Sequence, residues 1–155
     1  MKKSKLIIDT NLLLLLIVGS IENGRHIKSS NRLKAFKESD YQNVLNVMQQ
    51  YRAVYITPYI ATEISNLIDL TGYVYERALE VARAFFRIFE KINSDIEEDS
   101  APALFLRYGI TDTSLVKLAG EYTILTNDAR LLPPLYEACP ENVLPYELVK
   151  AARAL

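Results

Sequence analysis

The chain has 155 residues, of which half are hydrophobic and 24% are charged, and its formal net charge is −1. This size and composition are those of one globular domain with a sizeable core, and they exclude a disordered chain. A net charge near zero also excludes an overall positive field, so nucleic-acid binding would need a local basic patch.

The chain opens with MKKSKLII, a basic start followed by apolar residues, as in a signal peptide. However, Asp9, Thr10 and Asn11 interrupt the apolar stretch, and the run from Leu12 to Val18 is too short to span a bilayer. We therefore expect a soluble, cytoplasmic protein with no membrane partner.

The first third of the chain predicts a strand, a helix, an insertion and a second helix. Lys5–Ile8 is a short apolar run that predicts a buried strand, and Leu12–Val18 predicts a core helix. Residues 19–39 combine glycine and serine with several bases and predict a basic, loop-like insertion. Asp40 is a candidate cap for a helix that runs to about Tyr51.

The middle third continues the alternation. Ala53–Thr57 is rich in β-branched and aromatic residues and predicts a strand. Pro58 suits the first position of a helix that runs to about Leu70. Apolar spacings of three and four then predict an amphipathic helix over residues 74–92, and the acidic residues 93–102 predict a connection.

The last third predicts a helix beginning at Thr111, a strand over Tyr122–Leu125 and a helix start at Asp128. A last strand, Asn142–Leu144, and a terminal helix complete the chain. Strands alternating with helices indicate an α/β fold with a mostly parallel sheet.

One cysteine and one histidine restrict the chemistry that is available to the chain. Cys139 has no partner for an intramolecular disulfide, and a single His26 leaves no Cys/His spacing for a metal. One histidine also disfavours a histidine-based triad. Carboxylates are therefore the catalytic groups that we expect.

Four acidic residues stand where a parallel fold would gather them. Asp9 ends the first strand, Glu63 lies in the first turns of a post-strand helix, and Asp112 and Asp128 lie at predicted helix starts. Singly, Asp9 and Glu63 are better explained as a cap and a solvated side chain, and Asp112 and Asp128 are equally well explained as caps. Ligands of parallel α/β sheets bind outside the carboxyl ends of the strands, so we predict that the four form one site.

Carboxylates that converge repel one another unless a cation compensates their charge. Oxygen ligands of this kind suit Mg²⁺ or Mn²⁺, which can activate a water molecule beside a phosphate. Small polar neighbours of the acids are candidates for supporting hydrogen bonds, with local capping as an equal alternative. These are Asn11, Ser114, Thr126 and Asn127.

The segments LIIDTNLLL, TPYIATEISNL, GITDTSLVKLA and YTILTNDARLL resemble, in order, the four motif regions of PIN domains. The likeness covers roughly Lys5 to Leu132 and implies a Rossmann-like three-layer α/β/α sandwich, here a single PIN-like domain over residues 1–155. It implies an Mg²⁺- or Mn²⁺-dependent endoribonuclease, with the four acids at the family's acidic positions and Thr126 and Asn127 as the polar lead-in to the fourth.

Many PIN proteins of this size are toxins paired with an antitoxin, and many are homodimers. The resemblance therefore implies an RNA substrate, an antitoxin partner and a homodimer. The chain departs from the compact toxin pattern in residues 19–39 and in the long helix over residues 74–92.

Basic residues near these motifs are candidates for binding RNA phosphates, with a merely solvated surface as the alternative. They are Arg25, Lys28, Arg32 and Lys34 in the insertion, and Lys117 and Arg130 on helices that start at the predicted site.

Two other functions compete with the endoribonuclease. One is a catalytically silent PIN-like module that binds RNA or a protein. The other is a phosphoryl-transfer domain with Asp9 as the nucleophile, which the lack of a second acid two residues later disfavours.

Overall fold

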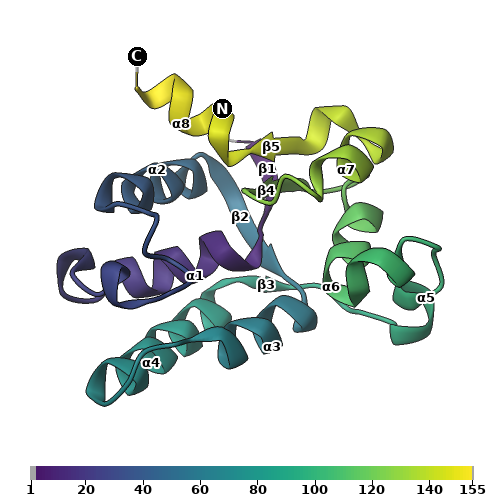
Figure 1. The fold of residues 1–155 in the computed structure, drawn as a ribbon. Coiled ribbons are helices and arrows are strands. Elements are labelled where there is room, and N and C mark those ends of the chain that lie inside the picture. The colour runs from purple at the N-terminus through teal and green to yellow at the C-terminus, as the bar shows by residue number, and fades with distance from the viewer. Residues whose placement is uncertain (1–2, 155) are drawn as a thin grey trace.

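A five-stranded, all-parallel sheet forms the centre of the computed structural model, which describes residues 3–154. The strand order β3-β2-β1-β4-β5 is Rossmann-like. Helices cover both faces, so the predicted three-layer α/β/α sandwich is confirmed (Figure 1). The strands are β1 (Lys3–Ile8), β2 (Tyr51–Ile56), β3 (Glu90–Lys91), β4 (Thr123–Thr126) and β5 (Val143–Pro145).

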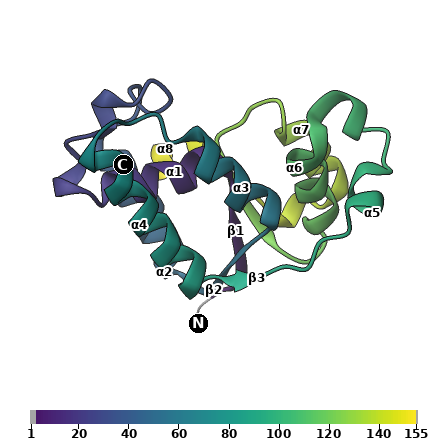
Figure 2. The ribbon, with the colours of Figure 1, turned by 90° about the horizontal axis from the view of Figure 1, so that it is seen from below.

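The helices fall into two groups, one on each side of the sheet (Figures 1 and 2). The first group is α1 (Thr10–Gly19), α2 (Glu38–Gln49), α3 (Pro58–Leu67) and α4 (Tyr73–Ile88). The second group is α5 (Ile96–Ser100), α6 (Phe105–Leu118) and α7 (Leu132–Ala138). The last helix, α8 (Tyr146–Arg153), packs against α2 and β5, and a 3₁₀ turn at Pro140–Asn142 precedes β5.

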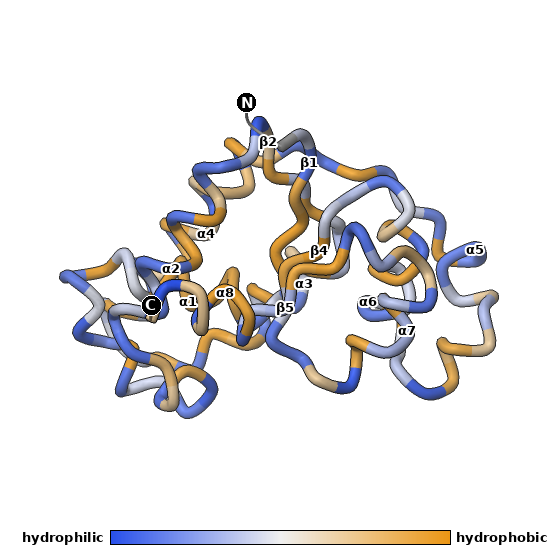
Figure 3. Tube along the Cα trace, turned by 90° about the horizontal axis from the view of Figure 1, so that it is seen from above, coloured by the Kyte–Doolittle hydropathy of each residue, from blue (hydrophilic) through white to orange (hydrophobic). Residues whose placement is uncertain are grey.

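The core is built on β1 and α1. Leu6 and Ile7 of β1 are fully buried, as expected for a parallel strand covered on both faces. The apolar residues of α1 are buried all round because α2, α3 and α4 pack against this helix. Figure 3 shows the hydrophobic strands at the centre of the molecule and hydrophilic segments at its ends.

Several predicted boundaries were wrong. Helix α2 begins at Glu38 with Lys37 as its N-cap, so Asp40 lies in the first turn rather than at the cap, and α6 begins at Phe105, before Thr111. The long helix ends at Ile88 because Glu90 and Lys91 leave it to pair with β2 as an edge strand. Residues 93–102 contain helix α5, which begins where the Asp95 side chain accepts from Glu98 N at 3.0 Å. Asp128 does not begin a helix: its carboxylate accepts from Arg130 N at 2.9 Å, which closes a turn, and α7 begins later.

Between α1 and α2, residues 20–37 of the predicted insertion 19–39 form no long helix or strand, as their composition indicated. They fold into turns that include two short 3₁₀ segments, Glu22–Gly24 and Ile27–Ser29. Ile21, Ile27 and Leu33 from this segment are buried in the core. The basic segment therefore has a fixed position against the domain.

Among the described helices, we find none with both the length and the apolar character that crossing a membrane requires.

Candidate functional site

The four acids picked out from the sequence line one pocket of about 430 Å³. The pocket lies at the carboxyl ends of β1 and β4, where the strand order reverses, which is where parallel α/β sheets bind ligands. Its lining residues come from five separate segments of the chain: Asp9, Thr10, Asn11, Arg32, Glu63, Asn66, Leu67, Asp112 and Asp128.

Asp9 joins the end of β1 to the start of α1. As the N-cap of α1, it accepts from Thr10 N at 2.8 Å through Oδ1. Its other oxygen, Oδ2, accepts from Thr126 Oγ1 at 2.7 Å. Asp9 is only 7% exposed, and burial raises its pKa, against the opposing effect of these two hydrogen bonds.

Glu63 reaches the pocket because α3 begins immediately after β2. Pro58 occupies the first turn of that helix, and Thr57 Oγ1 caps it by accepting from Ile60 N at 3.2 Å. The two Glu63 oxygens each accept a threonine hydroxyl, from Thr10 at 2.8 Å and from Thr111 at 2.6 Å. Glu63 therefore connects α1, α3 and α6.

Asp112 lies just after a break in α6 at Gly109, whose φ of 78° is outside the helical range. Its half-buried carboxylate accepts no hydrogen bond from any residue in the described range 3–154. Burial raises the Asp112 pKa to about 7, and the charges of Asp9, Asp128 and Glu63 act in the same direction. When Asp112 is ionised, its charge is thus not stabilised by a hydrogen bond from any described residue.

Asp128 follows β4 in a turn. The Thr126 hydroxyl accepts from Asp128 N at 3.0 Å while it donates to Asp9, so one hydroxyl links two of the acidic segments. Of the other predicted polar neighbours, Asn11 lines the pocket and Asn127 is half-buried beside Asp128. Ser114 instead donates to the Thr111 carbonyl oxygen at 2.6 Å, which is a bond within its own helix.

Sequence reasoning missed the hydroxyl groups of Thr10 and Thr111, which hold Glu63. A signal was present: Thr10 follows Asp9 directly, and Thr111 precedes Asp112 directly. A threonine beside an acid at a strand end or helix start can donate to a second acid that the fold brings close.

Two of the predicted RNA-binding residues reach the site. Arg32, from the basic segment, lines the pocket, and Arg130 is bonded through its backbone N–H to Asp128. Its charge also lowers the Asp112 pKa, though less than burial and the neighbouring acids raise it.

The other predicted basic residues are placed elsewhere. Arg25 pairs with Glu22 at 3.4 Å, and Lys28 donates to the backbone oxygen of Lys34 at 3.1 Å. Lys117 lies at 3.3 Å from both Glu98 and Asp99 and lines a different cavity of about 280 Å³. None of these side chains is among the residues that line the acidic pocket.

The donor chemistry of the pocket fits a hard divalent cation. Four carboxylates and the Asn11 amide supply oxygen ligands, which Mg²⁺ and Mn²⁺ prefer. The ligands are not preassembled: within residues 3–154, no three acidic, histidine or cysteine side chains are grouped closely enough to hold a metal. Both oxygens of Asp9 and of Glu63 are engaged with donors of the protein.

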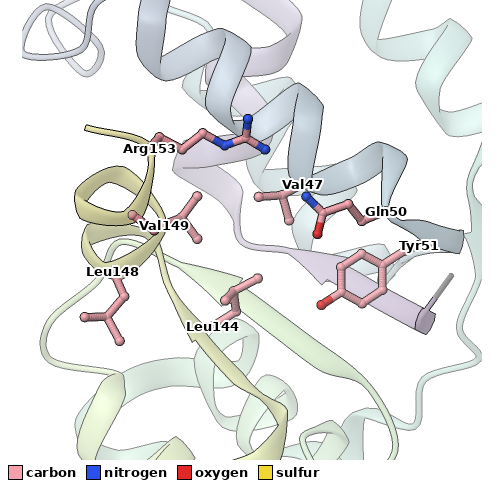
Figure 4. A pocket seen from close by; sticks show the side chains of 8 residues that line it. Val47, Gln50, Tyr51, Leu144, Leu148, Val149 and Arg153 are labelled. Carbon is pink, nitrogen blue, oxygen red and sulfur yellow. The ribbon is translucent and has the colours of Figure 1, made fainter. Parts of the chain in front are cut away.

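A second, contrasting cavity of about 550 Å³ lies between α2, β5 and α8 (Figure 4). Val47, Leu144, Leu148 and Val149 give it an apolar lining, and none of its lining residues is acidic. Of these two cavities, only the acidic pocket therefore has the carboxylates that the predicted metal chemistry needs.

No protein-family model matches the chain, and no curated protein matches it either. The acidic pocket and the sequence motifs that form it are therefore the features that bear on function.

Proposed function

We propose that this chain is a divalent-metal-dependent endoribonuclease of the PIN-domain type, which hydrolyses RNA phosphodiester bonds with Mg²⁺ or Mn²⁺. One observation carries the proposal: four acids that are far apart in the sequence line a single pocket at the switch point of a parallel sheet. The order of the four motifs, and their likeness to PIN domains, supports RNA as the substrate.

The electrostatics of the pocket favour a bound cation. Burial, and after it the neighbouring carboxylates, raise the Asp112 pKa, which means that the ionised site is unfavourable on its own. A divalent ion would compensate this repulsion, and Asp112, which accepts no hydrogen bond from residues 3–154, has both oxygens available to it.

Asp9, Glu63, Asp112 and Asp128 are the residues that would hold the ion. When bound, it would supply an activated water and stabilise charge on the phosphoryl oxygens. The threonine hydroxyls of positions 10, 111 and 126 orient Asp9 and Glu63. The Arg32 side chain lines the pocket, where its positive charge would attract a substrate phosphate.

Cleavage of an unstructured, fluorescently labelled RNA by chelator-treated protein tests the proposal. We expect activity to return with Mg²⁺ or Mn²⁺ and to be abolished by Asp112→Asn and by Asp9→Asn. Asp112→Asn is the sharper variant because no hydrogen bond from a described residue is lost with it. Glu137→Gln, at an exposed position on α7, is the matched control and should cleave normally. Folded Asp112→Asn protein with full activity would contradict the proposal.

A catalytically silent module that binds RNA or a protein is the second candidate. The observation that favours it is that the carboxylates are not grouped as a preformed metal site among residues 3–154. Tight RNA binding by the wild-type chain, with no cleavage under any divalent ion, would establish this alternative. A nucleophilic Asp9 is disfavoured because both its oxygens accept hydrogen bonds and it is buried.

The likeness to PIN-domain toxins extends the proposal to a toxin that an antitoxin protein restrains, acting as a homodimer. Induced expression of the wild-type chain should then arrest cell growth, and Asp112→Asn should not. Equal growth of the two strains would argue for RNA processing instead.

A further inference from the structure

Two arginines converge on one tyrosine ring, and one of them, Arg130, is bonded through its backbone to Asp128 of the acidic pocket. The Arg130 and Arg107 guanidinium carbons lie over the Tyr108 ring, at 5.3 Å and 5.7 Å from its centroid. Arg130 Nη2 also donates to the Arg107 backbone oxygen at 3.3 Å. We call Arg107 and Arg130 the arginine pair.

Among the described residues, the arginine pair forms no ion pair with a carboxylate. Both residues are exposed, and in the part of the chain that the structure describes neither lies within 4.0 Å of a carboxylate oxygen. By contrast, Arg77 and Lys117 each form an ion pair. The face of an aromatic ring attracts guanidinium groups and limits their rotation, so the ring holds two like charges close together. Most of their N–H donors remain available to an anion.

The backbone of Arg130 connects the arginine pair to the acidic pocket. Arg130 is two residues after Asp128 and donates to it through its backbone N–H at 2.9 Å. Arg32 reaches the same pocket from the segment of residues 19–39, on the side of α1 and α4, whereas the arginine pair comes from the side of α6 and α7 (Figure 2). The acidic pocket therefore has positive charge on both sides.

We propose that the arginine pair binds the phosphate backbone of single-stranded RNA beside the acidic pocket, and that Tyr108 positions the two guanidinium groups. This inference deepens the proposed ribonuclease function and rests on it. A guanidinium donates in a planar fork that matches phosphate oxygens, so two of them hold a backbone in a defined register.

Two features favour a single strand over a duplex or an acidic protein. Leu106, the residue before the pair begins, is 86% exposed, and unpaired bases offer apolar faces to such a side chain. Positive charge on both sides of the pocket suits an extended strand that crosses it.

The test is the affinity of a labelled single-stranded oligoribonucleotide, measured by fluorescence anisotropy in EDTA at several salt concentrations. The double variant Arg107→Gln/Arg130→Gln should bind at least about tenfold more weakly, and its salt slope should fall by about 1.4, because each phosphate contact on a single strand contributes about 0.7. The matched control is Arg83→Gln/Arg87→Gln on α4. It removes the same charge from exposed positions just before β3, at the amino ends of the strands and so away from the pocket. It should bind within about twofold of wild type.

Tyr108 has its own pair of variants. Tyr108→Phe keeps the ring and should keep the RNA affinity, whereas Tyr108→Leu should lose most of what the double arginine variant loses. Equal affinity of the two variants would overturn the positioning role of the ring.

Several outcomes overturn the inference. Two concern RNA binding itself: wild-type affinity in the double arginine variant, or no RNA binding by the wild-type chain. Two concern the partner: equal affinity for a duplex of the same sequence, or a double variant that loses binding to an acidic peptide but keeps binding to RNA. Cleavage measured in parallel separates the two proposals. RNA bound through the arginine pair but never cleaved would refute the ribonuclease alone, while cleavage with an unchanged KM in the variant would refute the arginine pair alone.

Discussion

Threonine hydroxyl groups decide how the acids of the pocket are oriented. Thr10, Thr111 and Thr126 each donate to a carboxylate, at distances of 2.8 Å, 2.6 Å and 2.7 Å. A hydrogen bond to a charged group stabilises a protein by about 1.5–3 kcal/mol. The hydroxyls therefore hold Asp9 and Glu63 in fixed rotamers, while Asp112, which has no such donor among the described residues, depends on other compensation.

Helix α6 offers a matched test of this role, because Thr111 and Thr113 are both buried but differ in their bonding. Thr113 Oγ1 has no partner within residues 3–154, whereas Thr111 Oγ1 donates to Glu63. We expect Thr113→Val to be neutral or to stabilise the fold by up to about 1 kcal/mol, because it removes an unsatisfied buried hydroxyl. Thr111→Val should cost about 1–3 kcal/mol by the same reasoning.

Urea denaturation measures the free energy of unfolding of both variants, and RNA cleavage separates a structural from a functional role. Thr111→Val should cleave about 10–100-fold more slowly, the usual effect of losing a bond that orients a metal ligand, and Thr113→Val should cleave normally. Equal changes in stability and activity for both variants would show that the bond to Glu63 does not orient the site.

At the scale of elements, the sequence predicts what depends on local pattern and misses what depends on distant contacts. The apolar run of β1, Pro58 at the start of α3 and the apolar face of α4 are local signals, and those elements form. The strand Glu90–Lys91 has only two residues, both exposed, and exists because β2 offers it a pairing edge. A strand of two residues is too short to give a periodic pattern in the sequence.

The site follows the same division. The acids were predictable because the carboxyl ends of parallel strands share one rim. The hydroxyl bridges were not, because Thr10 and Thr111 meet Glu63 across 53 and 48 positions of the chain. The charged residues also needed the structure: Lys117 was a candidate for RNA binding, but it forms ion pairs with α5, a helix that the sequence did not predict.

Gly109 is the element-scale feature that places Asp112. Its φ of 78° lies in a region that other residues adopt at a cost of about 1–3 kcal/mol, and the break lets α6 resume with Asp112 in the next turn. We expect Gly109→Ala to lose about that much stability and to reduce RNA cleavage. A Cβ at position 109 would meet no atom within 4 Å, so the loss would come from the backbone alone.

Gly120→Ala is the control for this substitution. A Cβ there also meets nothing within 4 Å, and the position lacks a positive φ, so its stability and activity should stay close to wild type. Thermal denaturation and cleavage assays on both variants check the expectation. A Gly109→Ala protein as stable and as active as Gly120→Ala would show that the break in α6 does not position Asp112.

The pocket is a property of the whole molecule, since the β1–α1 junction, α3, α6 and the turn after β4 each supply one acid. Holding four carboxylates on one rim opposes folding whenever they are ionised and uncompensated. Raising the Asp112 pKa from 3.8 to about 7 means that the folded chain keeps a proton that the unfolded chain releases. Its contribution to stability is therefore present below about pH 3.8 and is lost as the pH rises through about 7.

The stability of the whole fold should consequently depend on pH and on divalent ions together. In EDTA, wild-type protein should lose stability between about pH 5 and about pH 8 to a greater extent than Asp112→Asn, which cannot ionise there. At about pH 8, Mg²⁺ or Mn²⁺ should raise the wild-type Tm, because an ion at 100 times its Kd adds about 2.7 kcal/mol to a fold that alone binds it. At about pH 5 the gain should be smaller, since Asp112 then carries a proton and competes poorly for the ion.

Thermal denaturation of wild type, Asp112→Asn and Glu137→Gln at the two pH values measures these effects, with NaCl at equal ionic strength as the control for screening. Salt screens the repulsion between the carboxylates without binding at a specific site. A gain in Tm that NaCl reproduces would therefore mean that the pocket holds no ion. A gain that needs the divalent ion, rises with pH and disappears in Asp112→Asn requires a cation bound among these carboxylates. That dependence comes from the site itself, so it holds whether or not RNA is the substrate.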